Sequence, residues 1–254
     1  IAVFTIPFIL EFLSWQQIWG ILGLLCFVSA LLIQLFLNLD TTSSTVQTSV
    51  SSTQSSLSQI IGTTLTHPPI ICLALVFACY ASQWTSVTSF LPSLYVENGL
   101  SLKMTGLLVS LVVVANLGGT FGAGMLLQKG WTTQMLLTIG FVGMFVTSIL
   151  TFTTNSWLPF EIQFLNAVLF SMIGGVIPTT IFSMTLHYAP FTSAAAASMG
   201  LVIQCSALVQ FFVPPLSAAF VSATHTWASM SIVTSILCFI ALSILFIFFK
   251  RYAK

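Results

Sequence analysis

Polar and aromatic side chains recur at helical spacing inside long apolar segments of this sequence. Gln83 and Trp84 lie three and four residues after Tyr80, so the three share one face of a helix. Amide groups orient a bound molecule by hydrogen bonding, and an indole ring stacks on a planar one. Five further amides complete the candidate solute cavity, namely Asn116, Gln163, Asn166, Gln204 and Gln210.

Each of these polar groups has two open roles. A polar side chain in hydrocarbon is costly unless it contacts a partner or a water-filled cavity. Hydrogen bonds between membrane helices fulfil the first role and contribute about 0.6 kcal/mol on average. We expect two or three of the group to line a cavity for a small polar or planar solute. Asn166, with Asn116 as a second candidate, is expected opposite Gln83 across the bundle axis.

Patterns for catalysis and cofactor binding are absent from the sequence. It has no HExxH zinc motif, no GxSxG nucleophile motif and no phosphate-cradling loop. Its five cysteines form no CxxC pair, which argues against a metal site and a disulfide framework. We predict no catalytic residue, no metal, no cofactor and no enzymatic activity. Because no Asp, Glu, Lys or Arg lies mid-segment, a coupling carboxylate would have to come from outside this sequence.

These polar groups are carried by segments that suit a lipid bilayer. Lys and Arg number 5 and Asp and Glu number 4 among 254 residues, and the charged share of 4% compares with about 25% in soluble domains. A helix of roughly 20 apolar residues crosses the hydrocarbon core. Seven segments predict an all-α, polytopic membrane helix bundle, and they are 17–38, 68–94, 102–127, 131–153, 158–186, 193–222 and 227–249.

The basic residues predict an orientation for this bundle. If the spans alternate in direction, Lys129, Lys250, Arg251 and Lys254 share one side, and Lys103 lies on the other. The positive-inside rule then places the C-terminus and the linker in the cytoplasm. The formal net charge of +1 gives no indication of a nucleic-acid partner.

Composition divides the chain into three parts. Residues 41–59 are rich in Ser and Thr and too poor in apolar side chains to build a core. We predict an N-terminal bundle remnant over 1–38, a cytoplasmic Ser/Thr-rich linker over 39–67 and a six-helix bundle over 68–254. The apolar segment 1–13 is too short to span and begins without Met. We therefore expect a fragment of a longer protein, with one truncated helix and seven complete ones.

An internal repeat supports the idea of two related blocks. Ser14-Trp15 and Thr226-Trp227 each open the last helix of a block, and Leu25-Cys26-Phe27 recurs as Leu237-Cys238-Phe239. Repeated halves are typical of secondary transporters.

Glycine and proline residues mark candidate hinges. Small residues four apart allow close approach of helix backbones in lipid, either as static packing or as a sliding surface. Proline removes a helix hydrogen bond and clashes with the carbonyl four residues back, which bends a helix. The gating or hinge candidates selected in this way are Gly118, Gly122, Gly174, Gly175, Pro178, Pro214 and Pro215.

The sequence resembles the major facilitator superfamily over nearly its whole length. Residues 90–101 are similar to the end of that family's seventh helix and its outer loop, 118–130 to the eighth helix and its cytoplasmic turn, and 200–215 to the eleventh helix. Gln128 replaces the acidic residue of the family's turn motif. The stretch 200–215, closing on Trp227, and residues 174–178 also resemble the cyanate-permease-like branch.

The resemblance implies a secondary transporter in which two bundles rock about a midplane site, giving alternating access for a small solute. Its partners would be the lipid bilayer, a small-molecule solute and the missing N-terminal bundle of the same polypeptide. The expected location is a bacterial inner (plasma) membrane. Alone, this chain is expected not to transport, because the site would lose most of its walls. The alternative is a truncated, non-transporting membrane fragment or a structural or binding module.

Overall fold

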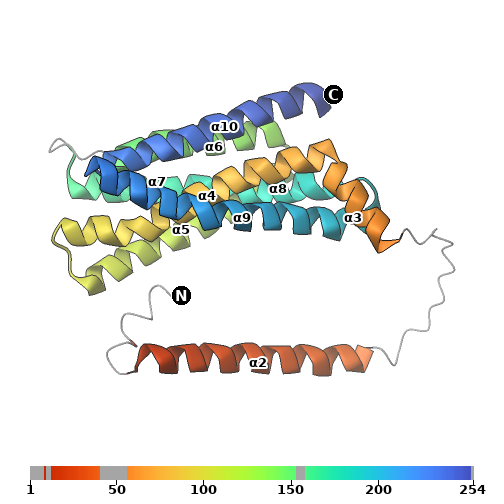
Figure 1. Cartoon of the computed structure of the whole chain (residues 1–254), viewed down its shortest axis with the longest axis horizontal. Coiled ribbons are helices and arrows are strands. Elements are labelled where there is room, and N and C mark those ends of the chain that lie inside the picture. The colour runs from red at the N-terminus through yellow and green to blue at the C-terminus, as the bar shows by residue number, and fades with distance from the viewer. Residues whose placement is uncertain (1–8, 10–12, 41–55, 153–157, 253–254) are drawn as a thin grey trace. The chain divides into compact units, whose positions relative to one another are not determined.

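The computed structural model describes residues 9, 13–40, 56–152 and 158–252. The chain forms two compact units, Ile1–Ser55 and Ser56–Lys254. The first contains helix α2 (Trp15–Asp40), and the second is a helical bundle (Figure 1). Most of the predicted truncated helix at 1–13 and most of the Ser/Thr-rich stretch lie outside the described residues.

Helix α2 begins with a reciprocal cap. The backbone N–H of Ser14 donates to Gln17 Oε1 at 2.8 Å, and the backbone N–H of Gln17 donates to Ser14 Oγ at 3.4 Å. This arrangement satisfies two donors that a helix start leaves unpaired. The apolar part of α2 runs for 22 residues, Trp15–Phe36, which is long enough to cross a membrane.

The second unit contains six candidate spans. They are α4 (Pro68–Glu97), α5 (Leu102–Gln128), α6 (Thr133–Phe152), the pair α7 (Phe160–Gly174) and α8 (Val176–His187), α9 (Ala195–Thr224) and α10 (Ala228–Tyr252). With α2, the described residues hold 7 helices or helix pairs long and apolar enough to span. The seven predicted spans are thus confirmed, with ends that differ by a few residues.

Two short elements were not predicted. Helix α3 (Leu57–Thr66) lies within the segment expected to be linker, and a 3-10 turn, η1 (Thr192–Ala194), leads into α9. Helix α3 packs on α9, η1 and α4.

Glycines end α4 and α5 in the same way. Gly99 has φ 85° and Gly130 has φ 87°, a left-handed conformation that glycine adopts at no steric cost. At the first turn Gly99 N–H bonds the Val96 carbonyl, and Leu100 N–H bonds the Tyr95 carbonyl. The same pair of bonds recurs around Gly130. Each is a Schellman motif, which satisfies the last carbonyls of a helix and fixes the tight turn to the next span.

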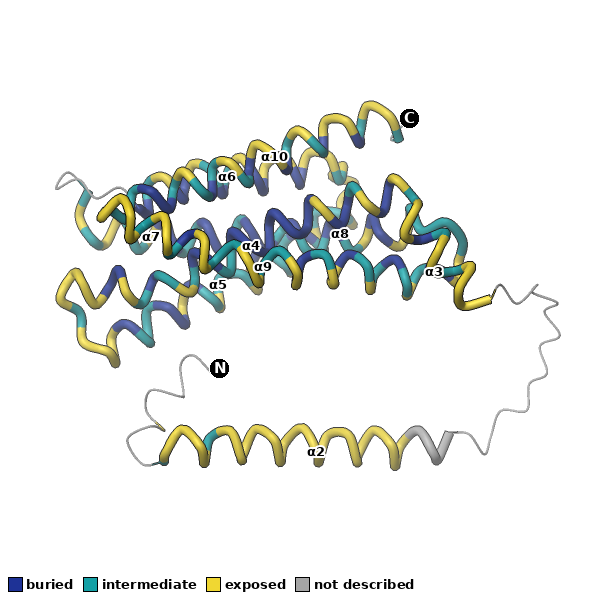
Figure 2. The backbone as a smooth tube through the Cα atoms, in the orientation of Figure 1, coloured by how far each residue is buried: buried dark blue, intermediate teal, exposed yellow. Residues whose placement is uncertain are grey.

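Helix α4 is the core of the bundle. It packs on α9, α10 and α5, and it also contacts α7 and α8. Figure 2 shows buried positions along its length, and these include Leu73, Leu91 and Tyr95. The outer helices expose large apolar side chains such as Phe121 and Phe246. Outward faces of this kind match a lipid environment.

The two proline sites differ. Helix α7 ends at Gly174 and α8 begins at Val176, because Pro178 offers no N–H to the Gly174 carbonyl. By contrast, α9 continues through Pro214 and Pro215, where Ser217 Oγ donates to the Val213 carbonyl at 2.8 Å. The predicted bend at the first site is a helix break, whereas the second site leaves its helix unbroken.

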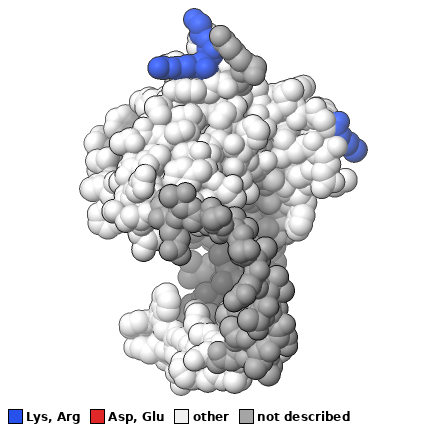
Figure 3. All heavy atoms as spheres, turned by 90° about the vertical axis from the view of Figure 1, so that its right-hand side faces the viewer, with Lys and Arg blue, Asp and Glu red and all other residues white. Residues whose placement is uncertain are grey.

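Charged side chains differ between the two ends of the bundle. One end of the bundle carries basic residues, with Lys129 directly after α5 and Lys250 and Arg251 in the last turn of α10. Figure 3 shows the molecule from this end, where Lys and Arg side chains are visible and Asp and Glu side chains are not. Glu97 ends α4 and Glu161 begins α7, at the opposite end.

Candidate solute-binding site

Four side chains from three helices meet near the middle of their spans, and we call them the midspan polar cluster: Tyr80, Trp84, Asn116 and Ser171. Asn116 Nδ2 donates to the Tyr80 hydroxyl at 3.3 Å and to the Ser171 carbonyl at 2.9 Å. Trp84 Nε1 donates to Ser171 Oγ at 3.1 Å. These bonds join α4 to α5 and α7, so the cluster holds together the three helices that carry it.

The cluster has hydrogen-bonding groups that are not fully paired. Tyr80 and Ser171 are buried, whereas Trp84 and Asn116 are partly exposed. Within the described chain, Asn116 Oδ1 accepts no hydrogen bond and the Tyr80 hydroxyl donates none. One acceptor therefore remains on the partly exposed Asn116 and one donor on the buried Tyr80. This pair suits a hydroxyl or amide group of a solute.

A glycine allows Tyr80 to lie close to α7. A Cβ atom at Gly174 would be 3.3 Å from Tyr80 Cε2 and 3.2 Å from Met144 Sδ. Both distances are tight for a Cβ contact. Gly174 therefore links the hinge region to the position of the Tyr80 ring.

The helix break lies directly against α5. A Cβ atom at Gly175 would lie 2.1 Å from the Asn116 carbonyl oxygen, and one at Gly119 would lie 1.7 Å from the Met172 carbonyl oxygen. The two backbones are thus in direct contact, which only glycine permits. Thr120 Oγ1 donates to the Gly175 carbonyl at 3.2 Å, where the chain passes from α7 to α8.

The closest approach differs in position from the predicted one. An added Cβ at Gly122 would meet no atom within 4 Å, and one at Gly118 would meet only the Met172 side chain, at 4.0 Å. The contact occurs at Gly119, one residue along, because the helix face that meets α7 is the one that also bears Asn116.

Gln83 faces a different helix from its two neighbours on α4. Its side chain is fully buried, and its Oε1 accepts from the Cys238 thiol of α10 at 3.0 Å. Its Nε2 has no partner within the described residues. No hydrogen bond there joins Gln83 to Asn166 or Asn116. One residue of helix rotation separates Gln83 from Trp84, which is enough to turn it from α7 toward α10.

The remaining amides are dispersed. Asn166 Nδ2 donates to the Ile162 carbonyl of its own helix at 2.8 Å. Gln163 lies near the start of α7 and borders a cavity that Glu97 also lines. Gln204 is exposed on α9 beside α3. Gln210 Oε1 accepts from Thr85 Oγ1 at 2.6 Å and so joins α9 to α4.

The family model of the Major Facilitator Superfamily matches residues 1–214. The chain belongs to the Major Facilitator Superfamily. Membership makes this an integral membrane protein of a transporter family rather than an enzyme. No curated protein matches the sequence.

A solved structure of the superfamily agrees with the fold. The crystal structure of a variant of the E. coli fucose:proton symporter FucP superposes with a TM-score of 0.63 at 17% sequence identity. The match covers 79% of this chain and 47% of that chain, so this chain spans about half the length of FucP. At this identity the likeness establishes the superfamily fold alone.

Three residues that the structure places here are not among those predicted from the sequence: Ser171 of the midspan polar cluster, and Gly119 and Thr120 at the contact between α5 and the helix break. Ser171, Thr120 and Gly119 are small residues without a distinctive pattern of their own. A usable signal was available for Thr120, which is one helical turn after Asn116 and lies on the same face. The contribution of Ser171 depends on its backbone carbonyl as well as its hydroxyl, and sequence patterns do not show backbone acceptors.

Proposed function

We propose that the protein moves a small, uncharged polar solute across the membrane by alternating access, with the midspan polar cluster as part of the solute site. The observation that carries this proposal is the free donor and acceptor at Tyr80 and Asn116, halfway along their spans. Midplane sites at helix interruptions are typical of secondary transporters. The break between α7 and α8 lies beside these residues.

The absence of charge in the cluster supports a neutral solute. Its contacts come from a phenol, an indole, an amide and a hydroxyl. A site of this kind holds hydroxyl and amide groups by directed hydrogen bonds and offers no ion pair to a charged molecule. Fucose, which FucP carries by its name, belongs to the same chemical class. Residues 174–178 support placement in the cyanate-permease-like branch. Cyanate is an anion, however, and the uncharged cluster favours a neutral solute for this member of the branch.

The proposed setting is a bacterial inner membrane. The end of the bundle that bears Lys129, Lys250 and Arg251 would face the cytoplasm by the positive-inside rule. A remaining bundle of the same polypeptide would supply the opposite wall of the solute site.

Uptake by cells that express the full-length polypeptide, with the remaining bundle present, tests the proposal. The solutes would be radiolabelled L-fucose, glycerol, uridine, glutamine and, as an anion, cyanate. We expect saturable uptake of at least one neutral solute. In Asn116→Leu and Tyr80→Phe, uptake per molecule should fall about two- to tenfold, because each change removes hydrogen-bonding capacity worth about 0.5–1.5 kcal/mol per bond.

Gln204→Leu is the matched control, since it removes an exposed amide on α9, a helix that contributes no residue to the cluster. It should leave uptake per molecule unchanged. Normal uptake in Asn116→Leu at normal abundance would contradict the site assignment. Absence of any saturable uptake would favour a non-transporting membrane module.

A further inference from the structure

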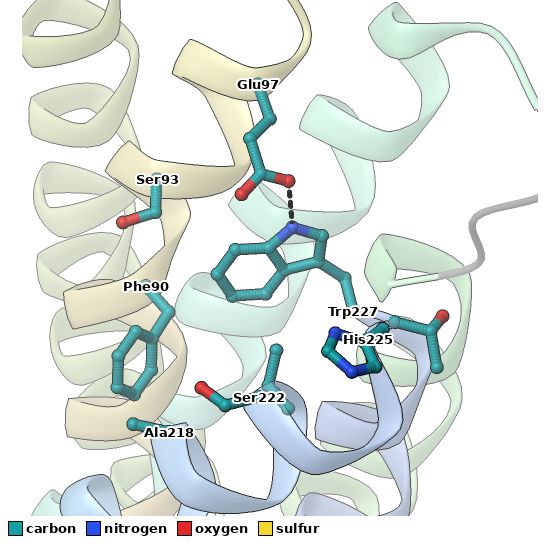
Figure 4. A pocket seen from close by; sticks show the side chains of 9 residues that line it. Phe90, Ser93, Glu97, Ala218, Ser222, His225 and Trp227 are labelled. Carbon is teal, nitrogen blue, oxygen red and sulfur yellow. Dashed lines mark hydrogen bonds between the residues drawn. The ribbon is translucent and has the colours of Figure 1, made fainter.

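A cavity lies at one end of the bundle, where α4 and α9 end and α10 begins. We call it the end pocket, and its volume of about 480 Å³ is within the range of small-molecule sites. Figure 4 shows Phe90 and Glu97 of α4 on one side, and His225 and Trp227 on the other. The proposed transport site at midspan uses none of these residues.

The end pocket contains an incompletely paired carboxylate. Trp227 Nε1 donates to Glu97 Oε2, as the dashed line in Figure 4 marks. In the part of the chain that the structure describes, the other oxygen of Glu97 accepts no hydrogen bond and forms no ion pair. The side chain is exposed rather than buried. A carboxylate held by one neutral donor can still bind a cationic group through a charge-assisted contact.

Two aromatic rings line the same pocket, and that of Trp227 contacts the carboxylate. The ring centroids of Phe90 and Trp227 are 6.3 Å apart, with an angle of 46° between the planes. Both rings are only partly buried. Aromatic faces attract ammonium groups through the ring quadrupole, and quaternary ammonium ions are bound in this way. The pocket thus combines one negative charge with apolar, electron-rich walls.

The turn that forms the far wall is conformationally constrained. His225 ends α9 with φ 51° and ψ 28°, a left-handed conformation that non-glycine residues seldom adopt. The chain reverses direction at this turn between α9 and α10. Trp227, just before α10, therefore reaches Glu97 at the end of α4.

We infer that the end pocket binds a small organic cation of the alkylammonium class, similar in size to tetramethylammonium or choline. A single carboxylate does not meet the demand of Ca²⁺ for six to eight oxygen ligands. An anion would be repelled by Glu97. The hydroxyls of Ser93 and Ser222 in the same pocket could accept or donate to the hydroxyl of a choline-like ligand.

Equilibrium binding of radiolabelled tetramethylammonium to the full 254-residue chain in lipid nanodiscs tests this inference. We expect saturable binding at one site, and Glu97→Gln should weaken it about tenfold or more, since a charge-assisted contact is lost. Trp227→Leu should also weaken it, whereas Trp227→Phe keeps an aromatic face and should retain part of the affinity. Glu161→Gln is the matched control, because it removes another carboxylate at this end without altering the pocket.

Two further measurements sharpen the test. The first asks whether the end pocket recognises the charge of the ligand or only its shape, and the second asks whether the ligand binds in the end pocket or at midspan. The neutral choline isostere 3,3-dimethylbutanol should compete weakly or not at all. Equal competition, unchanged binding in Glu97→Gln, or no saturable binding in the unaltered chain would each overturn the inference. The variant Asn116→Leu should bind tetramethylammonium normally, so failure of the midspan site and failure of the end pocket give different results. Helical content by circular dichroism confirms that each variant is folded.

Discussion

At the scale of single residues, burial and pairing separate two groups of polar side chains that look alike in the sequence. Asn116 is partly exposed and has a free acceptor. Gln83 is fully buried, accepts from a thiol and leaves Nε2 without a partner within the described residues. An unpaired buried donor costs about 1–3 kcal/mol. Gln83 is therefore proposed to lie behind the solute site rather than in it.

Substitution of Gln83 tests this assignment. We expect Gln83→Leu to keep uptake per molecule and to maintain or raise thermal stability in membranes. The change removes the unpaired amide, and the Cys238 thiol retains the Phe141 carbonyl at 3.5 Å as an acceptor. Uptake and membrane abundance would be measured together. A fall in uptake per molecule at normal abundance would return Gln83 to the solute site.

Gln210 provides the contrasting case. Gln210→Leu removes the acceptor of the Thr85 hydroxyl and breaks a direct bond between α4 and α9. Interhelical hydrogen bonds in membranes contribute about 0.6 kcal/mol on average. This variant should lower the melting temperature of the purified protein slightly, in the direction opposite to Gln83→Leu. A rise in melting temperature would show that the Thr85 bond is not stabilising.

At the scale of elements, the contact between α5 and the α7–α8 break decides how closely these helices pack. Gly119→Ala would place a Cβ atom 1.7 Å from a backbone carbonyl oxygen, so the helices must separate. Overpacking of this kind costs about 1–3 kcal/mol. We expect a clear loss of folded protein in fluorescence-detected size-exclusion chromatography. Gly122→Ala, where an added Cβ meets nothing within 4 Å, is the control and should be neutral.

The helix break itself gives a second prediction at this scale. Pro178→Ala restores an N–H that can bond the Gly174 carbonyl, so α7 and α8 should join into one helix. We expect higher thermal stability and lower uptake per molecule, because a straight helix would resist rocking. Pro215→Ala serves for comparison, since α9 is already continuous there. Unchanged uptake in Pro178→Ala would show that the break is fixed shape rather than a moving hinge.

At the scale of the whole molecule, charge predicts which end faces the cytoplasm. A reporter enzyme that is active only outside the cytoplasm would be fused after Lys254 or inserted after Asn98. These positions follow α10 and α4, which end at opposite sides of the bundle. We expect activity from the Asn98 insertion and none from the Lys254 fusion. The reverse result would invert the proposed orientation and place the end pocket in the cytoplasm.

The sequence by itself determined the class and the segment plan of this protein. Apolar runs of about 20 residues must form helices in a bilayer, because hydrocarbon leaves backbone groups no other partners. The glycines at 99 and 130 and the prolines in the first turn of α4 are local signals, and they predict where helices turn and begin. Family membership followed from motifs spread along the chain, since it depends on sequence order rather than on contacts.

Only the tertiary structure decided which polar residues act together. Tyr80, Gln83 and Trp84 have helical spacing that groups them, yet Gln83 contacts α10 while Trp84 contacts α7. The glycines give a second example. Gly118 fits the predicted spacing of small residues, yet Gly119 is the residue that contacts the backbone of α7. In a soluble helix, an apolar stripe indicates which face is buried. Here lipid and protein are both apolar, so hydrophobicity does not distinguish the faces, and only the packing of neighbouring helices determines the partner of each side chain.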